Sequence, residues 1–112
     1  MSTYEEIDAT AADALVEGGA FLLDVRTDDE WDAGHAPAAT LVTLGQLADR
    51  VDELPTDRRI VVICRSGARS GRAAEALVGA GYDAVNLAGG MQAWAALGLA
   101  VVTDAGEPGS VA

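Results

Sequence analysis

The sequence predicts an α/β fold, a three-layer α/β/α sandwich in which helices cover both faces of a mainly parallel sheet. Short apolar runs of strand length alternate along the chain with segments of helical spacing. The strongest strand candidate, RIVVIC at 59–64, is apolar on both of its faces after its first residue. A run of this kind suits a parallel strand that is covered on both sides. The 112 residues fit one domain with a core of its own.

The first elements are a helix and a strand. Apolar residues at helical spacing across 11–16 predict a helix, with Asp8 or Thr10 as its N-cap and Gly18 at its end. The apolar run FLLDV at 21–25 has the length of a strand. Helix and strand together start the alternation that a parallel sheet requires.

The next segment predicts a short helix, a strand and a longer helix. DDEWDAG at 28–34 reads as a helix that ends at its glycine, and an extended stretch follows near 39–42. Thr43 is placed to cap a helix that continues through Leu54 and is ended by Pro55.

The second half of the chain continues the pattern. Apolar positions across 73–78 predict a helix after the 59–64 strand, and AVNL at 84–87 predicts another short strand. A glycine-started helix is expected over about 90–97, followed by a final extended piece, LAVVT, at 99–103. The small and polar residues of 104–112 predict a frayed tail.

Charge is distributed unevenly along the chain. The formal net charge is −11, from 18 acidic and 7 basic side chains, and all the basic residues are arginines. This balance argues against nucleic-acid binding, whereas docking of a basic partner on an acidic surface stays open. Residues 58–72 contain five of the arginines and no acid, and the only cysteine, Cys64, lies inside this basic window. The window is therefore the main functional clue.

The cysteine count and the lack of long apolar runs indicate the setting. One cysteine cannot form an intramolecular disulfide or a zinc site of several thiolates, so we expect no metal and a reducing, cytoplasmic location. No apolar segment approaches the ~20 residues of a membrane span, and the N-terminus lacks the basic start and apolar run of a signal peptide. We expect no membrane partner, and a monomer because no exposed apolar stripe is evident.

The loop after the 59–64 strand predicts an anion-binding site. Ligands of open α/β sheets collect at the carboxyl ends of strands. A glycine-containing loop can turn successive N–H groups inward, and the following helix adds positive charge at its N-terminus. Such a nest lowers the pKa of a cysteine at its base, which predicts a nucleophilic thiolate. The alternative is a structural role as a small buried apolar residue. The loop is Cys64, Arg65, Ser66, Gly67, Ala68, Arg69 and Ser70.

Three segments in order resemble a known family. CRSGARS (64–70) resembles the active-site loop of the rhodanese family of sulfurtransferases. LLDVRTDDEWDAGHAPAA (22–39) resembles its first signature, and LAGGMQAWAALGLAV (87–101) its closing Gly-Gly-x-x-x-Trp helix. The resemblance covers roughly 7–102, which we expect to be the domain, between tails at 1–6 and 103–112. It implies a five-stranded parallel sheet, and we expect no cofactor.

The resemblance also implies a two-step mechanism and roles for the loop residues. Cys64 would take sulfane sulfur from a small anionic donor such as thiosulfate, carry it as a persulfide, and pass it to cyanide or a thiol. The backbone N–H groups from Arg65 to Ser70 would form the cradle. Arg65 would steer the donor. Arg69 would either contact the anion or pair with an acid to hold the loop, and we favour the second. Ser70 would be the helix N-cap or a further hydrogen-bond donor.

Side chains at the end of the 21–25 strand should lie near this loop if the two strands are neighbours. Asp24 and Arg26 would then support it. We favour a structural arrangement in which Arg26 pairs with Glu30 and Asp24 braces backbone amides. His35, the only histidine, is expected to be structural, because an ionised thiol needs no base. Trp31 could border the mouth of the pocket.

Two other functions compete with a sulfurtransferase. A cysteine phosphatase or arsenate reductase would use Cys-x5-Arg to enclose a tetrahedral oxyanion. Here the spacing from Cys64 to Arg69 is Cys-x4-Arg, one residue shorter, which suits a single sulfur atom better. A persulfide relay to a protein acceptor would use the same residues as the enzyme, so the sequence leaves it open.

Overall fold

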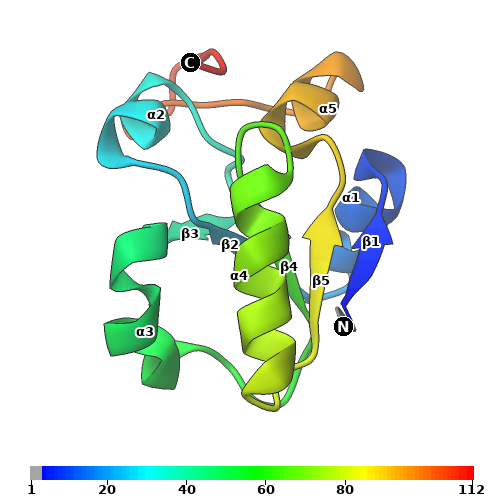
Figure 1. Cartoon of the computed structure of the whole chain (residues 1–112). Coiled ribbons are helices and arrows are strands. Elements are labelled where there is room, and N and C mark those ends of the chain that lie inside the picture. Colours follow the sequence, from blue (N-terminus) through cyan, green and yellow to red (C-terminus); the bar gives the residue numbers. More distant parts are fainter. Residues whose placement is uncertain (1–3) are drawn as a thin grey trace.

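A five-stranded parallel sheet forms the centre of the computed structural model, which describes residues 4–112 (Figure 1). The strand order is β1-β5-β4-β2-β3, and every neighbouring pair is parallel. This confirms the α/β class and the parallel sheet. The strands are β1 (Glu5–Ile7), β2 (Phe21–Asp24), β3 (Ala39–Leu41), β4 (Ile60–Ile63) and β5 (Ala84–Leu87).

Helices cover the two faces of the sheet, and β4 is buried between them. Side chains alternate along the strand, so Val62 packs with α3 and α4 on one face and Val61 packs with α1 and α5 on the other. All four residues of β4 are buried, as the doubly apolar run predicts. The helices are α1 (Ala9–Glu17), α2 (Asp28–Ala33), α3 (Leu47–Arg50), α4 (Ala68–Gly79) and α5 (Gly90–Ala96). Within residues 4–112, no helix combines the length and the apolar character needed to cross a membrane.

Local capping explains where the first two helices begin. The Asp8 carboxylate accepts a hydrogen bond from the Ala11 amide at 2.8 Å, so Asp8 rather than Thr10 is the N-cap of α1. Thr27 caps α2 through a reciprocal pair of hydrogen bonds with Glu30. The predicted end of α2 at its glycine is observed.

The helix predicted from Thr43 to Leu54 is broken into short pieces. A 3₁₀ turn at Leu44–Gln46, the single α-turn of α3 and a second 3₁₀ turn at Val51–Glu53 replace it. Thr43 makes no side-chain capping bond. The prediction of one helix is therefore wrong, because Gly45 has low helix propensity and no cap fixes the first turn.

The N-terminal segment also differs from its prediction. Residues 1–6 were expected to be a tail, but β1 pairs with β5 along the register Glu5↔Val85 to Ile7↔Leu87. Glu5 and Glu6 are exposed, so this edge strand lacks the apolar pattern of the buried strands. Residues 1–3 of the expected tail lie outside the described part of the chain.

The C-terminal segment is attached to the domain rather than frayed. Val102, in the predicted extended piece, forms antiparallel bridges with His35 and Pro108. The amide of Ser110 donates to the Ala33 carbonyl at 2.9 Å. The frayed-tail prediction is wrong because backbone hydrogen bonds, which leave no apolar pattern, hold this segment.

Candidate active site

The candidate site lies at the carboxyl end of β4, where the chain turns into α4 (Figure 1). Cys64 directly follows the last residue of β4. The neighbouring strand β2 ends at Asp24, whose register partner is Ile63. The expected neighbourhood of these two strand ends is therefore observed. In a parallel sheet all carboxyl ends share one edge, which brings the following loops together.

The sulfur of Cys64 is buried and receives hydrogen bonds from its own loop. The residue is 1% exposed. Its Sγ accepts from the Gly67 amide at 3.1 Å and from the Ser70 hydroxyl at 3.2 Å. Burial on its own raises the pKa of the Cys64 thiol. The Ser70 hydroxyl and the backbone amides of Ser70, Gly67 and Ser66 outweigh burial and lower that pKa below its usual value. The loop thus favours a thiolate.

Gly67 makes the curl of the loop possible. It is the N-cap of α4 and has a φ of +105°, a conformation that side chains other than glycine rarely adopt. A Cβ atom here would also lie 3.1 Å from the Gly89 nitrogen. The Gly67 carbonyl accepts from the Asn86 side-chain amide of β5 at 3.0 Å, which ties the loop to the next strand.

The start of α5 holds the other side of the loop. The Met91 amide donates to the Cys64 carbonyl at 2.7 Å, and the Gln92 amide donates to the Arg65 carbonyl at 3.0 Å. Gly90 has a φ of +55°, and a Cβ atom at this position would overlap the Cys64 carbonyl oxygen. The glycine therefore permits the close approach of the α5 backbone to the loop.

Arg69 pairs with an acid from α2. Its two terminal nitrogens donate to the two oxygens of the Glu30 carboxylate at 2.7 and 2.8 Å. The Arg69 guanidinium, with help from Thr27, lowers the pKa of Glu30 to about 2, against a smaller opposing effect of burial. Of the two arrangements expected for Arg69, the structure contains the ion pair that joins the loop to α2.

Asp24 and Arg26 form a buried ion pair, both fully enclosed. The Arg26 guanidinium donates to both Asp24 oxygens, at 3.0 and 2.8 Å, and to the Gly34 carbonyl at 2.8 Å. The Asp24 carboxylate also braces the Arg26 amide, as expected. The expected pairing of Arg26 with the Glu30 carboxylate is wrong. Arg26 reaches only the Glu30 main-chain carbonyl, at 3.3 Å, because Arg69 occupies the carboxylate.

The remaining loop residues lie at the surface. Arg65, Ser66 and Ala68 are exposed. Arg65 donates from Nε to the Ala112 carbonyl at 2.7 Å, which places the C-terminal segment beside the loop. Ser70, in contrast, is buried and acts as a hydrogen-bond donor to sulfur, while the N-cap position belongs to Gly67.

The sequence matches a family model for the rhodanese-like domain over residues 8–97. The chain belongs to the rhodanese family. Its relatives include a sulfurtransferase of Allochromatium vinosum, which is 43% identical over 86 residues that cover 76% of this chain and 80% of the relative. They also include the thiosulfate sulfurtransferase GlpE of Pseudomonas syringae, which is 35% identical over 84% of this chain and 90% of the relative.

Solved structures of the family agree with the fold of this rhodanese-like domain. A crystal structure of a rhodanese-related protein from Thermoplasma volcanium superposes with a TM-score of 0.83 and 30% identity. The match covers 88% of this chain and 98% of that one. The predicted family and fold are therefore confirmed.

Three features of this rhodanese-like loop were not predicted from the sequence. They are the identity of the acid that pairs with Arg69, which is Glu30, the Asn86 amide on Gly67, and the close approach at Gly90. Asn86 did carry a signal, because it is the one polar residue in the buried strand 84–87. The other two depend on packing between distant segments.

The side chains of Trp31 and His35 contact each other and the C-terminal segment rather than the cysteine loop. Trp31 stacks on His35 with ring centroids 3.6 Å apart and donates from Nε1 to Asp104 at 3.1 Å. His35 Nδ1 lies 3.0 Å from the Trp31 carbonyl. These contacts attach the C-terminal segment to α2 rather than border the cysteine. In the described part of the rhodanese-like domain, no cluster of three or more His, Cys, Asp or Glu side chains is arranged to hold a metal ion.

Proposed function

We propose that this chain is a sulfurtransferase that carries sulfane sulfur as a persulfide on Cys64. One observation carries the proposal. The sulfur lies at the start of α4 with an N–H and an O–H donor directed at it, an arrangement that stabilises negative charge on sulfur. Within residues 4–112, no arginine hydrogen-bonds to this sulfur, so the charge is available for reaction.

The proposed reaction has two balanced steps. The Cys64 thiolate attacks the outer sulfur of thiosulfate, an S–S bond forms on the enzyme, and sulfite leaves with the electron pair of the broken bond. Cyanide or a thiolate then attacks the outer persulfide sulfur and the Cys64 thiolate is released. The loop donors stabilise both the thiolate and the persulfide anion. No external oxidant and no cofactor is needed.

Arg65 has a role in donor binding under this proposal. It is exposed beside the nucleophile, and in the described part of the chain only its Nε makes a hydrogen bond. Its two terminal nitrogens are available to an oxyanion such as the sulfonate end of thiosulfate. As partners we propose a small anionic donor and a thiol, cyanide or protein acceptor. We also propose that the chain acts as a monomer in a reducing cytoplasm.

The geometry of Arg69 argues against the phosphatase alternative. A phosphatase loop needs its arginine free to clamp the oxyanion from both nitrogens. Here both terminal nitrogens of Arg69 are bound to Glu30. Hydrolysis of an aryl phosphate that is lost in Cys64→Ser would favour the phosphatase instead.

Intact-mass measurement tests the proposal. Incubation with thiosulfate should add one sulfur atom to the wild-type chain, and cyanide should remove it as thiocyanate. Cys64→Ala should take up no sulfur while its circular dichroism and melting temperature stay close to wild type. Sulfur uptake by the folded Cys64→Ala chain would contradict the mechanism. A screen of small thiols and thiol proteins on the loaded chain would then separate an enzyme from a relay.

A further inference from the structure

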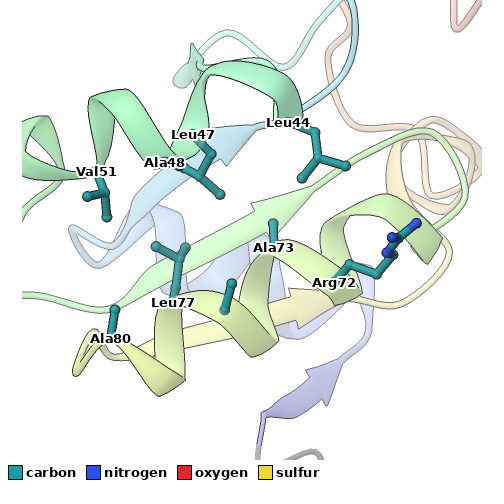
Figure 2. Close-up of a pocket in the computed structure, with 9 residues that line it drawn as sticks. Leu44, Leu47, Ala48, Val51, Arg72, Ala73, Leu77 and Ala80 are labelled. Carbon is teal, nitrogen blue, oxygen red and sulfur yellow. The ribbon is translucent and has the colours of Figure 1, made fainter.

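An apolar cavity of about 540 Å³ that is open to solvent lies between α3 and α4, on the face of the sheet away from α1 and α5 (Figure 2). Four of its lining residues, Ala48, Arg72, Ala76 and Ala80, are exposed. One wall is formed by Leu47 and Val51, and the facing wall by Ala73 and Leu77 of α4. Figure 2 shows these side chains directed toward one another across the gap. The volume falls within the range of about 300–1,000 Å³ that is typical of small-molecule sites. Cys64 does not line this cavity.

The space exists because small side chains line both α3 and α4, where larger side chains would interdigitate and fill it. Ala73 and Ala76 of α4 and Ala80, which directly follows α4, line the gap together with Ala48 of α3. Alanine cannot fill the separation between two helices as leucine would. The opposite wall is also thin, because α3 is only four residues long and is flanked by 3₁₀ turns. The cavity is therefore built into the packing of this layer.

Arg72 is the single charged residue that lines the cavity. In Figure 2 it lies at the end nearest the start of α4, and Ala80 lies at the other end. No hydrogen bond or ion pair joins Arg72 to any residue of the described range 4–112, although the chain has 18 acidic residues to 7 arginines. The other six arginines each have a partner there, which is a carboxylate or a main-chain carbonyl.

We propose that this cavity binds an amphiphilic organic anion, with a short apolar body between α3 and α4 and one carboxylate or sulfonate at Arg72. The apolar walls exclude a small inorganic anion as the best ligand, and the unpaired guanidinium selects against a cation. Contact with Arg72 and burial of the apolar body supply the affinity, because the net negative charge of the chain opposes anions at longer range. This site is separate from the cysteine loop and does not depend on sulfur transfer.

Decanoate and decanol form a matched pair of probes, because they share a chain length and differ in charge. Calorimetric titration below the micelle concentration should show that the wild-type chain binds decanoate more tightly than decanol. Arg72→Gln should weaken decanoate binding about fivefold, the effect of losing a solvent-exposed ion pair, and leave decanol binding unchanged. Arg50→Gln removes the same charge from α3, outside the cavity, and should leave both affinities unchanged.

A second variant tests the location. Ala76→Phe should block both probes by filling the cavity, whereas Ala95→Phe on α5 should not, and both should melt near the wild-type temperature. Equal binding of decanoate and decanol, or unchanged decanoate binding in Arg72→Gln or in folded Ala76→Phe, would overturn the proposal. So would a wild-type dimer in sedimentation that Ala76→Phe dissociates, because a second copy would then occupy the cavity.

Discussion

The carboxyl ends of β2 and β4 are neighbours in the sheet, but they differ in charge pairing. The acid at the end of β2 is paired with a cation, whereas the cysteine at the end of β4 is not. At the end of β2, the buried Asp24 carboxylate is matched by the Arg26 guanidinium, which also satisfies the Gly34 carbonyl. At the end of β4, Cys64 receives two hydrogen bonds and has no cation bonded to it within residues 4–112. Burial is nearly complete at both ends.

The difference separates a structural role from a chemical one. A buried ion pair whose hydrogen bonds are satisfied has no donor or acceptor left for a ligand, so its role is structural. A buried sulfur with donors but no counter-ion is stabilised as an anion and still free to attack. Equal burial therefore says little about function, and the balance of charge decides it.

Glu30 connects the two strand ends. Its main-chain carbonyl accepts from Arg26, and its carboxylate holds Arg69 of the cysteine loop. The ion pair at the end of β2 thus helps to position the cysteine loop at the end of β4 through α2. Variants that alter each end, and the link between them, test this comparison.

The largest effect should come from breaking the buried Asp24–Arg26 ion pair at the end of β2. Arg26→Met leaves the buried Asp24 carboxylate without a partner, which should lower the free energy of unfolding by about 3–5 kcal/mol. Urea denaturation measures it. The double change Asp24→Leu with Arg26→Met should recover part of the loss, and Arg50→Met, at an exposed pair, should leave the unfolding midpoint unchanged. A stable single variant would mean that this pair is not a brace.

The second largest effect should come from displacing the α5 backbone, which contacts the cysteine loop at the end of β4. In Gly90→Ala the new methyl group would overlap the Cys64 carbonyl at a φ of +55°, which should cost about 2–4 kcal/mol of stability and slow sulfur loading. Gly79→Ala is the matched control, since nothing lies near its Cβ position and its backbone is helical. It should stabilise the chain by about 0.5–1 kcal/mol. Normal loading by Gly90→Ala would show that α5 does not set the loop.

The link through Glu30 predicts a pH dependence of stability. The pKa of Glu30 is lowered from 4.5 to about 2 in the folded chain, so its pairing with Arg69 stabilises fully above the unfolded value. That contribution, about 1–2 kcal/mol because Arg69 is partly solvated, should be lost as the pH falls from about 5 through 2. Urea midpoints across this range measure it. Glu30→Gln should flatten the slope of the urea midpoint against pH. An unchanged slope would show that the Glu30–Arg69 pair does not cause the pH dependence.

The smallest effect concerns the hydrogen bonds to sulfur. Ser70→Ala removes the hydroxyl that lowers the pKa of Cys64, so less thiolate should exist at neutral pH. At pH values below the pKa of Cys64, the rate of alkylation by iodoacetamide should be about tenfold lower than in the wild type. The pH at which this rate rises should be higher in the variant. Ser66→Ala, whose side chain is exposed, should leave the rate unchanged. Equal rates in both variants would show that the hydroxyl does not tune the thiol.

Much of the site follows from contiguous residues. The β4 run, the glycine loop and the start of α4 are consecutive, so their strand, turn and cap signals predict the position of Cys64 and the donors around it. The strand at 84–87 was predicted with its observed bounds. The predictions failed where backbone contacts rather than apolar patterns hold a segment, as at β1 and near Ser110.

The sequence by itself determined the family, the parallel sheet and the cysteine loop, because hydrophobic periodicity and turn chemistry are written along the chain. Only the tertiary structure decided which charges pair. Asp24 rather than Glu30 takes Arg26, Glu30 takes Arg69, and Arg72 is left beside an apolar cavity. An ion pair depends on the distance between side chains from separate elements, and with 18 acids available the order of residues does not specify that distance.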